Sequence, residues 1–124
     1  MVVKQPWVWA VALWAVLSVG TTASADVYDA MVAGNYEQAV VIWQEMADQG
    51  NGQAQFNLGL MYHSGMGVQQ DEPTAVGWYQ RAAENGYGPA QVYMVVGYEE
   101  GWFGLPKDSG KASYWRKMMQ GTLE

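Results

Sequence analysis

The chain has 124 residues, a formal net charge of −6 at pH 7 and no cysteine. The acidic balance argues against nucleic acid and anionic membrane surfaces as partners, because both are recognised by clustered lysine and arginine. Without cysteine there is no disulfide framework, thiolate metal site or lipid-modified cysteine, so the core is held by packing alone.

The N-terminal 25 residues are predicted to be a cleaved signal peptide. Lys4 supplies a positive start, Trp7 to Val19 is an uncharged apolar run, and residues 23–25 form a small-x-small tripeptide. An uncleaved membrane anchor is the competing interpretation, but this apolar run is shorter than the roughly 20 residues that a spanning helix needs. We therefore expect cleavage between Ala25 and Asp26. The product would be one small periplasmic or secreted domain without a membrane attachment.

After residue 25 the sequence repeats itself about every 36 residues. Five identical residues recur at this spacing: Ala39, Ala47, Gly50, Ala54 and Gln55 return as Ala75, Ala83, Gly86, Ala90 and Gln91. One loop residue is then added, so that Gly67 is matched by Gly104. A period in this range is typical of a helical-pair solenoid, in which stacked units share one core.

Helical patterns follow one another along the whole of this region. The second predicted helix carries an i, i+3, i+4, i+7, i+8 apolar stripe from Ala39 to Ala47. Asn35 and Gln38 are expected to form a capping box at the start of this helix. Asp71 is expected to cap the fourth. We predict six helices in three antiparallel pairs, over residues 26–33, 35–50, 52–64, 71–86, 89–100 and 108–120.

The middle of the chain carries a longer pattern of residues. It consists of Ala54-Gln55-Phe56-Asn57-Leu58-Gly59-Leu60-Met61-Tyr62, Gly65-Met66-Gly67-Val68, Asp71, Ala75, Trp78-Tyr79, Arg81-Ala82-Ala83 and Gly86. This stretch resembles one complete Sel-one-like repeat, a family related to the tetratricopeptide repeats. With a partial repeat over 26–50, a full repeat over 51–86 and a divergent terminal repeat over 87–124, the resemblance covers the chain after the signal. It implies an all-α, right-handed solenoid of about three antiparallel hairpins.

The terminal repeat departs from the family pattern. Met94-Val95 replace the usual Leu-Gly, Met118-Met119 replace paired alanines, and the loop 101–106 is longer and more aromatic. These changes fit a unit that caps the end of the stack, as terminal repeats do. They also fit a docking patch rich in methionine and aromatic residues. Self-stacking of arrays through this end is a further possibility.

Residues for catalysis and metal binding are sparse. His63 is the only histidine, so neither a histidine pair for a metal nor a Cys-His nucleophile can form. Asp71 and Glu72 are explained by a helix start, and Glu99 and Glu100 by a solvated helix end. We predict a protein that is not an enzyme and has no cofactor and no metal. The alternative is an envelope small-ligand-binding protein or weak hydrolase that uses His63 and nearby carboxylates.

The family resemblance implies an adaptor or scaffold that binds a protein or peptide on the concave face of the array. At 100° per residue, one side of helices 52–64 and 89–100 lies opposite the side that packs on the paired helix. This side is an apolar strip with a polar rim, formed by Gln53, Phe56, Leu60, His63, Val92, Val96 and Glu99. The competing interpretation is that the apolar members are core, covered by adjoining helices. The sequence does not identify the partner.

Overall fold

The computed structural model describes residues 23–121. Nearly all of the predicted signal peptide therefore lies outside the described residues. Within the described range the only regular secondary structure is helix, and no helix there is long and apolar enough to cross a bilayer. The prediction of an all-α fold with six helices is confirmed. The helices are residues 23–32, α2 (Tyr36–Asp48), α3 (Gly52–Ser64), α4 (Glu72–Glu84), α5 (Gly88–Glu100) and α6 (Ser109–Met119).

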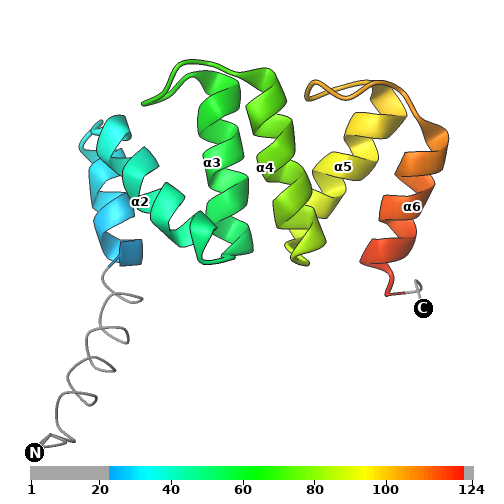
Figure 1. Cartoon of the computed structure of the whole chain (residues 1–124), viewed down its shortest axis with the longest axis horizontal. Helices are drawn as coiled ribbons and strands as arrows, with labels where there is room; N and C mark the ends of the chain where they lie inside the picture. Colours follow the sequence, from blue (N-terminus) through cyan, green and yellow to red (C-terminus); the bar gives the residue numbers. More distant parts are fainter. Residues whose placement is uncertain (1–22, 122–124) are drawn as a thin grey trace, which may run out of the picture.

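The helices stand in a row in chain order, and the turns between them alternate between the two edges of the row (Figure 1). Neighbouring helices are therefore antiparallel. From α2 onwards, each labelled helix packs on the helix that follows it in the chain. This is the local pairing expected of a solenoid, in which no hairpin buries its apolar face alone.

Side-chain caps start three of the helices. Asn51, Asp71 and Asp108 have extended backbone conformations, and each accepts a hydrogen bond from the backbone N–H three residues later. The predicted cap at Asp71 is confirmed. The predicted capping box at Asn35 is wrong, because its backbone is not extended and its side chain donates to the Gln38 side chain instead, at 2.8 Å.

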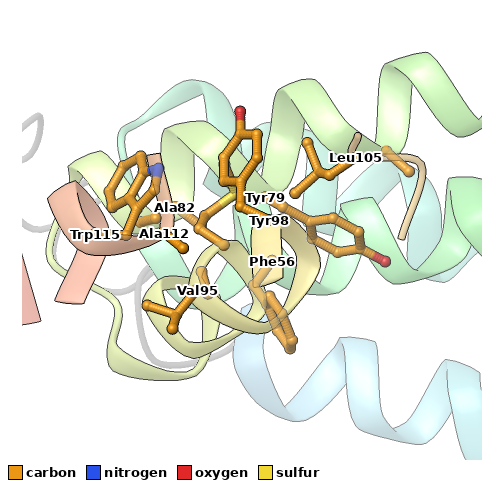
Figure 2. Packing of buried hydrophobic residues seen from close by; sticks show 12 residues of the cluster. Phe56, Tyr79, Ala82, Val95, Tyr98, Leu105, Ala112 and Trp115 are labelled. Carbon is orange, nitrogen blue, oxygen red and sulfur yellow. The ribbon is translucent and has the colours of Figure 1, made fainter. Parts of the chain in front are cut away.

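The buried apolar residues form two clusters, one in each half of the row. Tyr62 packs against both, so the two cores are continuous through α3. Figure 2 shows part of the second cluster, with Trp115 and Ala112 of α6 on one side and Leu105 on the other. The first cluster consists of Val27, Ala30, Ala39, Trp43, Ala47, Ala54, Leu58 and Met61.

A glutamine joins the helices at each of two equivalent turns. The Gln55 side chain donates to the carbonyl of Ala47, and the Gln91 side chain donates to the carbonyl of Ala83, both at 3.1 Å. Because the helix end carries carbonyls without partners, this bond fixes the turn from α2 to α3 and from α4 to α5 in the same way. Repeated sequence thus gives repeated geometry.

Candidate binding site

An open notch lies between the first helix and α3. Its volume is about 220 Å³, and it is lined by Tyr28, Met31, Trp43, Gln53, Asn57, Leu60, Met61 and Met66. The Gln53 amide donates to the Tyr28 hydroxyl at 3.4 Å, which links the first helix to α3 at the edge of the notch. The open notch is therefore apolar inside, with two side-chain amides and a tyrosine hydroxyl among its lining groups.

Trp43 of α2 is one of two buried members of this lining, and Met61 is the other. The Trp43 side chain is 3% exposed, and the Tyr28 ring meets it edge-on with ring centroids 6.2 Å apart. The indole Nε1 is buried without a hydrogen-bond partner. Leaving a buried donor unpaired costs about 1–3 kcal/mol. Trp43 thus lines the open notch and carries a buried N–H without a partner.

The equivalent positions one repeat later form a second, filled notch between α3 and α5. Trp43 is replaced by Tyr79 and Asn57 by Tyr93, 36 residues further on. The Tyr93 ring lies 4.9 Å from the Phe56 ring and 5.3 Å from the Tyr79 ring. It also stacks on Phe103, at 4.3 Å and 15°. Aromatic rings therefore occupy, between α3 and α5, the space that stays empty in the open notch.

The backbone is shaped to accept these rings. A Cβ on Gly59 would lie 2.6 Å from Cε1 of Tyr79, so only glycine lets α3 approach that ring. A Cβ on Gly97 would lie 2.6 Å from Cδ1 of Leu105, which comes from the loop after α5. Gly97 stands where the open notch has Met61, so Leu105 fills this space from a different direction.

The aromatic loop before α6 has two faces. Phe103 and Leu105 turn inward onto the second cluster, while Trp102 is exposed. Phe103 has a φ of 56°, a left-handed conformation that is uncommon for a residue other than glycine. Stacking on Tyr93 holds Phe103 in this conformation. The extra residue in this loop thus brings an additional ring to the filled notch.

The structure separates the residues that the sequence placed in one strip. Gln53 and Leu60 line the open notch. Phe56 is 8% exposed in the second cluster, so the core interpretation applies to it. Val96 is half-buried and Val92 is exposed.

The two polar residues at the far end of the predicted strip have other surroundings. Glu99 forms an ion pair with Arg116 of α6. His63 is half-buried, with Nδ1 buried and without a hydrogen-bond partner. Among residues 23–121, no hydrogen bond or ion pair joins its imidazole to a carboxylate, and no three metal-binding side chains gather. These residues do not assemble an acid–base pair.

Sequence reasoning missed most of the lining of the open notch. Trp43 and Met61 lie on stripes that indicate core, and the sequence does not reveal that a core stripe ends beside a notch. One signal was present, because Asn57 and Tyr93 occupy equivalent positions and differ strongly in volume and polarity. The missed residues are Tyr28, Met31, Trp43, Asn57, Met61 and Met66.

Tyr79 of the filled notch has a raised pKa. Burial, and to a smaller degree repulsion from the Tyr93 phenolate, raise the pKa of Tyr79 well above its usual value. The hydroxyl of Tyr79 is buried without a hydrogen-bond partner. It therefore stays protonated, and it has no acid–base role at ordinary pH.

The repeated geometry has counterparts among known proteins. The model of the Sel1 repeat matches three ranges of this chain, residues 28–51, 52–87 and 90–115. The chain belongs to the Sel1 repeat family. This confirms the resemblance to Sel-one-like repeats. The Sel1 repeat is a non-enzymatic fold for protein interactions, so the chain carries an interaction scaffold.

Two solved structures are similar along most of the chain. The Sel1 repeat protein from Oxalobacter formigenes is 32% identical with a TM-score of 0.62, and the match covers 85% of this chain and 88% of that one. A protective antigen of uropathogenic Escherichia coli strains, c5321, which displays an SLR fold, is 30% identical with a TM-score of 0.59. That match covers 72% of this chain and 19% of the antigen.

A curated relative matches a shorter part. DAP3-binding cell death enhancer 1 of Rattus norvegicus is 40% identical over 55 residues, which are 44% of this chain and 11% of that protein. The chain therefore matches only a small part of that relative's length.

Proposed function

We propose that the protein is a non-catalytic adaptor that binds an extended peptide segment of a partner protein in the open notch. The observation that carries the proposal is the buried, unpaired Nε1–H of Trp43 beside an apolar notch. A peptide that inserts an apolar side chain brings a backbone carbonyl with it. If binding uncovers the buried Nε1–H of Trp43, that carbonyl accepts from it and removes the cost of the unpaired donor.

The side-chain amide of Asn57 on α3 provides hydrogen bonds for the backbone of a bound peptide. Asn57 lines the open notch, and a primary amide can donate to a peptide carbonyl and accept from a peptide N–H. These hydrogen bonds recognise the peptide backbone, whatever its sequence. The apolar interior of the notch then selects the peptide side chain. The proposed ligand is therefore a segment with one medium-sized apolar residue in an extended stretch.

The volume favours a peptide over a small molecule. Small-molecule sites typically enclose about 300–1,000 Å³, whereas the open notch has about 220 Å³. A single side chain fits this space. The alternative function, hydrolysis through His63 and nearby carboxylates, has less support, because no carboxylate within residues 23–121 is paired with that imidazole.

The test is to fill the open notch with tyrosine at Asn57, because the equivalent position of the filled notch is Tyr93. Peptides are selected from a displayed library on the wild-type protein, and their affinities are measured for Asn57→Tyr. We expect selected peptides to share one apolar residue and to lose binding to Asn57→Tyr by at least tenfold. The matched control is Gln80→Tyr, on an exposed position of α4 outside the notch lining, which should bind as the wild type does. Equal affinity of Asn57→Tyr and wild type would overturn the proposal.

We further propose that the adaptor works outside the cytoplasm, in the periplasm or after secretion. The support is the sequence pattern of the first 25 residues, with its short apolar run and small-x-small end. Cleavage between Ala25 and Asp26 would remove three residues of the first helix and keep Val27 and Ala30, which belong to the first cluster. Intact mass of the protein recovered from a periplasmic extract tests this. Recovery of only the uncleaved mass, in the cytoplasm, would contradict it.

A further inference from the structure

One position of the repeat is occupied very differently in α2, α4 and α6. Val41, Gly77 and Tyr114 are equivalent in the repeat, and all three are exposed. Val41 is 57% exposed and Tyr114 is 47% exposed, while a Cβ on Gly77 would meet nothing within 4 Å. The outer face of α2, α4 and α6 thus has an apolar side chain at each end and none at its centre.

The apolar side chains at the two ends are flanked by opposite charges. On α2, Val41 lies between Glu37 and Glu45 at four-residue spacing, which places all three on one side of the helix. On α6, Tyr114 lies between Lys111 and Lys117 at three-residue spacing. All of these flanking side chains are exposed. We call the two sets the acidic stripe (Glu37, Val41, Glu45) and the basic stripe (Lys111, Tyr114, Lys117).

The wider charge distribution agrees with this division. Residues 23–50 contain five carboxylates and no lysine or arginine, whereas α6 contains three basic residues and no acidic one. The first hairpin and α6 lie at opposite ends of the row (Figure 1). A second copy of the chain, turned end for end, therefore presents a basic end to the acidic end and an acidic end to the basic end.

We propose that two copies of this chain form an antiparallel dimer through the outer faces of α2, α4 and α6. The acidic stripe of each copy contacts the basic stripe of the other, and the two α4 helices meet at Gly77 on the two-fold axis. Such an interface is self-complementary, because each contact occurs twice. The missing side chain at Gly77 lets the centres of the two faces approach, and longer side chains span the ends.

The opposite charges also determine the direction of pairing. A parallel arrangement would put acidic stripe on acidic stripe, and like charges across an interface are strongly disfavoured. Two chains of net charge −6 repel one another overall. The antiparallel arrangement places the basic residues of α6 where they offset that repulsion. We therefore expect the dimer to weaken at high salt, since screening shortens the reach of exposed charges to about 3 Å at 1 M.

The dimer leaves the open notch free. Trp43 and the other lining residues lie on the side of the first helix and α3, away from the outer face of α2. Two notches in one particle allow two segments of a partner to bind together, which raises the apparent affinity without any new contact. The dimer is independent of the peptide proposal, and either can fail without the other.

The test uses sedimentation velocity of the protein produced from its full coding sequence, with paired charge reversals. Glu37→Lys with Glu45→Lys gives a variant with two basic stripes, and Lys111→Glu with Lys117→Glu gives one with two acidic stripes. We expect the wild type to show a monomer–dimer equilibrium at low salt. Each variant alone should be monomeric, and an equimolar mixture of the two should recover the dimer. Circular dichroism of each variant checks that the helices remain.

Other outcomes overturn the proposal. Species larger than a dimer would indicate head-to-tail chains instead of a two-fold pair. A wild type that stays monomeric at high concentration and low salt, or a mixture that does not associate, would remove the interface. Gly77→Glu adds bulk and like charge on the axis and contacts nothing within its own chain. It should abolish the dimer without lowering the melting temperature, and a persistent dimer would place the axis elsewhere.

Discussion

The open notch and the filled notch are built from equivalent positions of successive repeats, yet the first stays open and aromatic rings occupy the second. One of the differences is that Asn57 on α3 is replaced by Tyr93 on α5. Tyr93 brings a ring into contact with Phe56 and Phe103, and the interval becomes part of the core. Side-chain volume at this position is thus one reason why the filled notch is packed and the open notch is not.

The two intervals also differ in what they contribute to stability. Each aromatic pair in the filled notch adds about 0.5–1.5 kcal/mol beyond the area that it buries. Both notches keep a buried polar atom without a partner at the equivalent position, Nε1 of Trp43 in the open notch and the hydroxyl of Tyr79 in the filled one. The difference in stability therefore comes from the aromatic pairs, which the filled notch has in larger number.

The largest effect is expected from removing the ring at the centre of the filled notch. Phe56 contacts the rings of Tyr79, Tyr87 and Tyr93, with centroids 4.9–5.5 Å apart. Phe56→Ala should therefore lower the free energy of unfolding by about 3–5 kcal/mol. Urea denaturation followed by circular dichroism measures the loss. Leu60→Ala is the matched control in the open notch and should cost only about 1 kcal/mol, since that side chain is half-buried. Similar costs at the two positions would contradict the division into filled and open notches.

A smaller effect is expected from converting the filled notch toward the open one. Tyr93→Asn removes a half-buried ring and its stack on Phe103, so the free energy of unfolding should fall by about 2 kcal/mol. Near-ultraviolet circular dichroism should report the loss of ring packing while the helical signal remains. Isothermal titration with peptides selected on the open notch should then detect a second, weaker site. If stability is unchanged, Tyr93 is not what closes this interval.

The fold was predictable from the sequence because the interactions that define it are local. Apolar spacing within each helix and the 36-residue period between helices both follow from contacts between chain neighbours, and the helix ends agree with the predicted ones to within a few residues. The predicted capping box at Asn35 is wrong because the exposed side chains of Asn35 and Gln38 hydrogen-bond to each other and not to the backbone. That choice depends on backbone angles, which the residue types alone do not determine.

The site was less predictable because it depends on contacts between repeats. Helical geometry predicted Phe56 on the side of α3 away from its paired helix, but Phe56 contacts Tyr79 of α4, and Tyr87 and Tyr93 of the next repeat cover it. Trp43 was correctly placed on a core stripe, but the stripe does not show that an open notch borders it. Side-chain volumes on adjacent helices decide between core and groove, and a periodic pattern does not record them.

The smallest effect is a gain, from removing the hydroxyl of Tyr79. This hydroxyl is buried and has no hydrogen-bond partner, so Tyr79→Phe should raise the free energy of unfolding by about 1 kcal/mol. Tyr114→Phe, at an exposed position, is the control and should change nothing measurable. Peptide binding should also be unchanged, because Tyr79 belongs to the filled notch. A loss of stability in Tyr79→Phe would mean that the hydroxyl has a partner after all.

The pH dependence of the same variant tests the cause. A tyrosine in an unfolded chain ionises near pH 10, and burial raises the pKa of Tyr79 further in the folded protein. As the pH rises above about 10, the unfolded state releases this proton first, so the wild type loses stability that Tyr79→Phe keeps. The difference in free energy of unfolding between the wild type and Tyr79→Phe should therefore be constant near neutral pH and grow in alkaline solution. A constant difference up to high pH would mean that solvent reaches the Tyr79 hydroxyl. The filled notch would then be as accessible to solvent as the open notch.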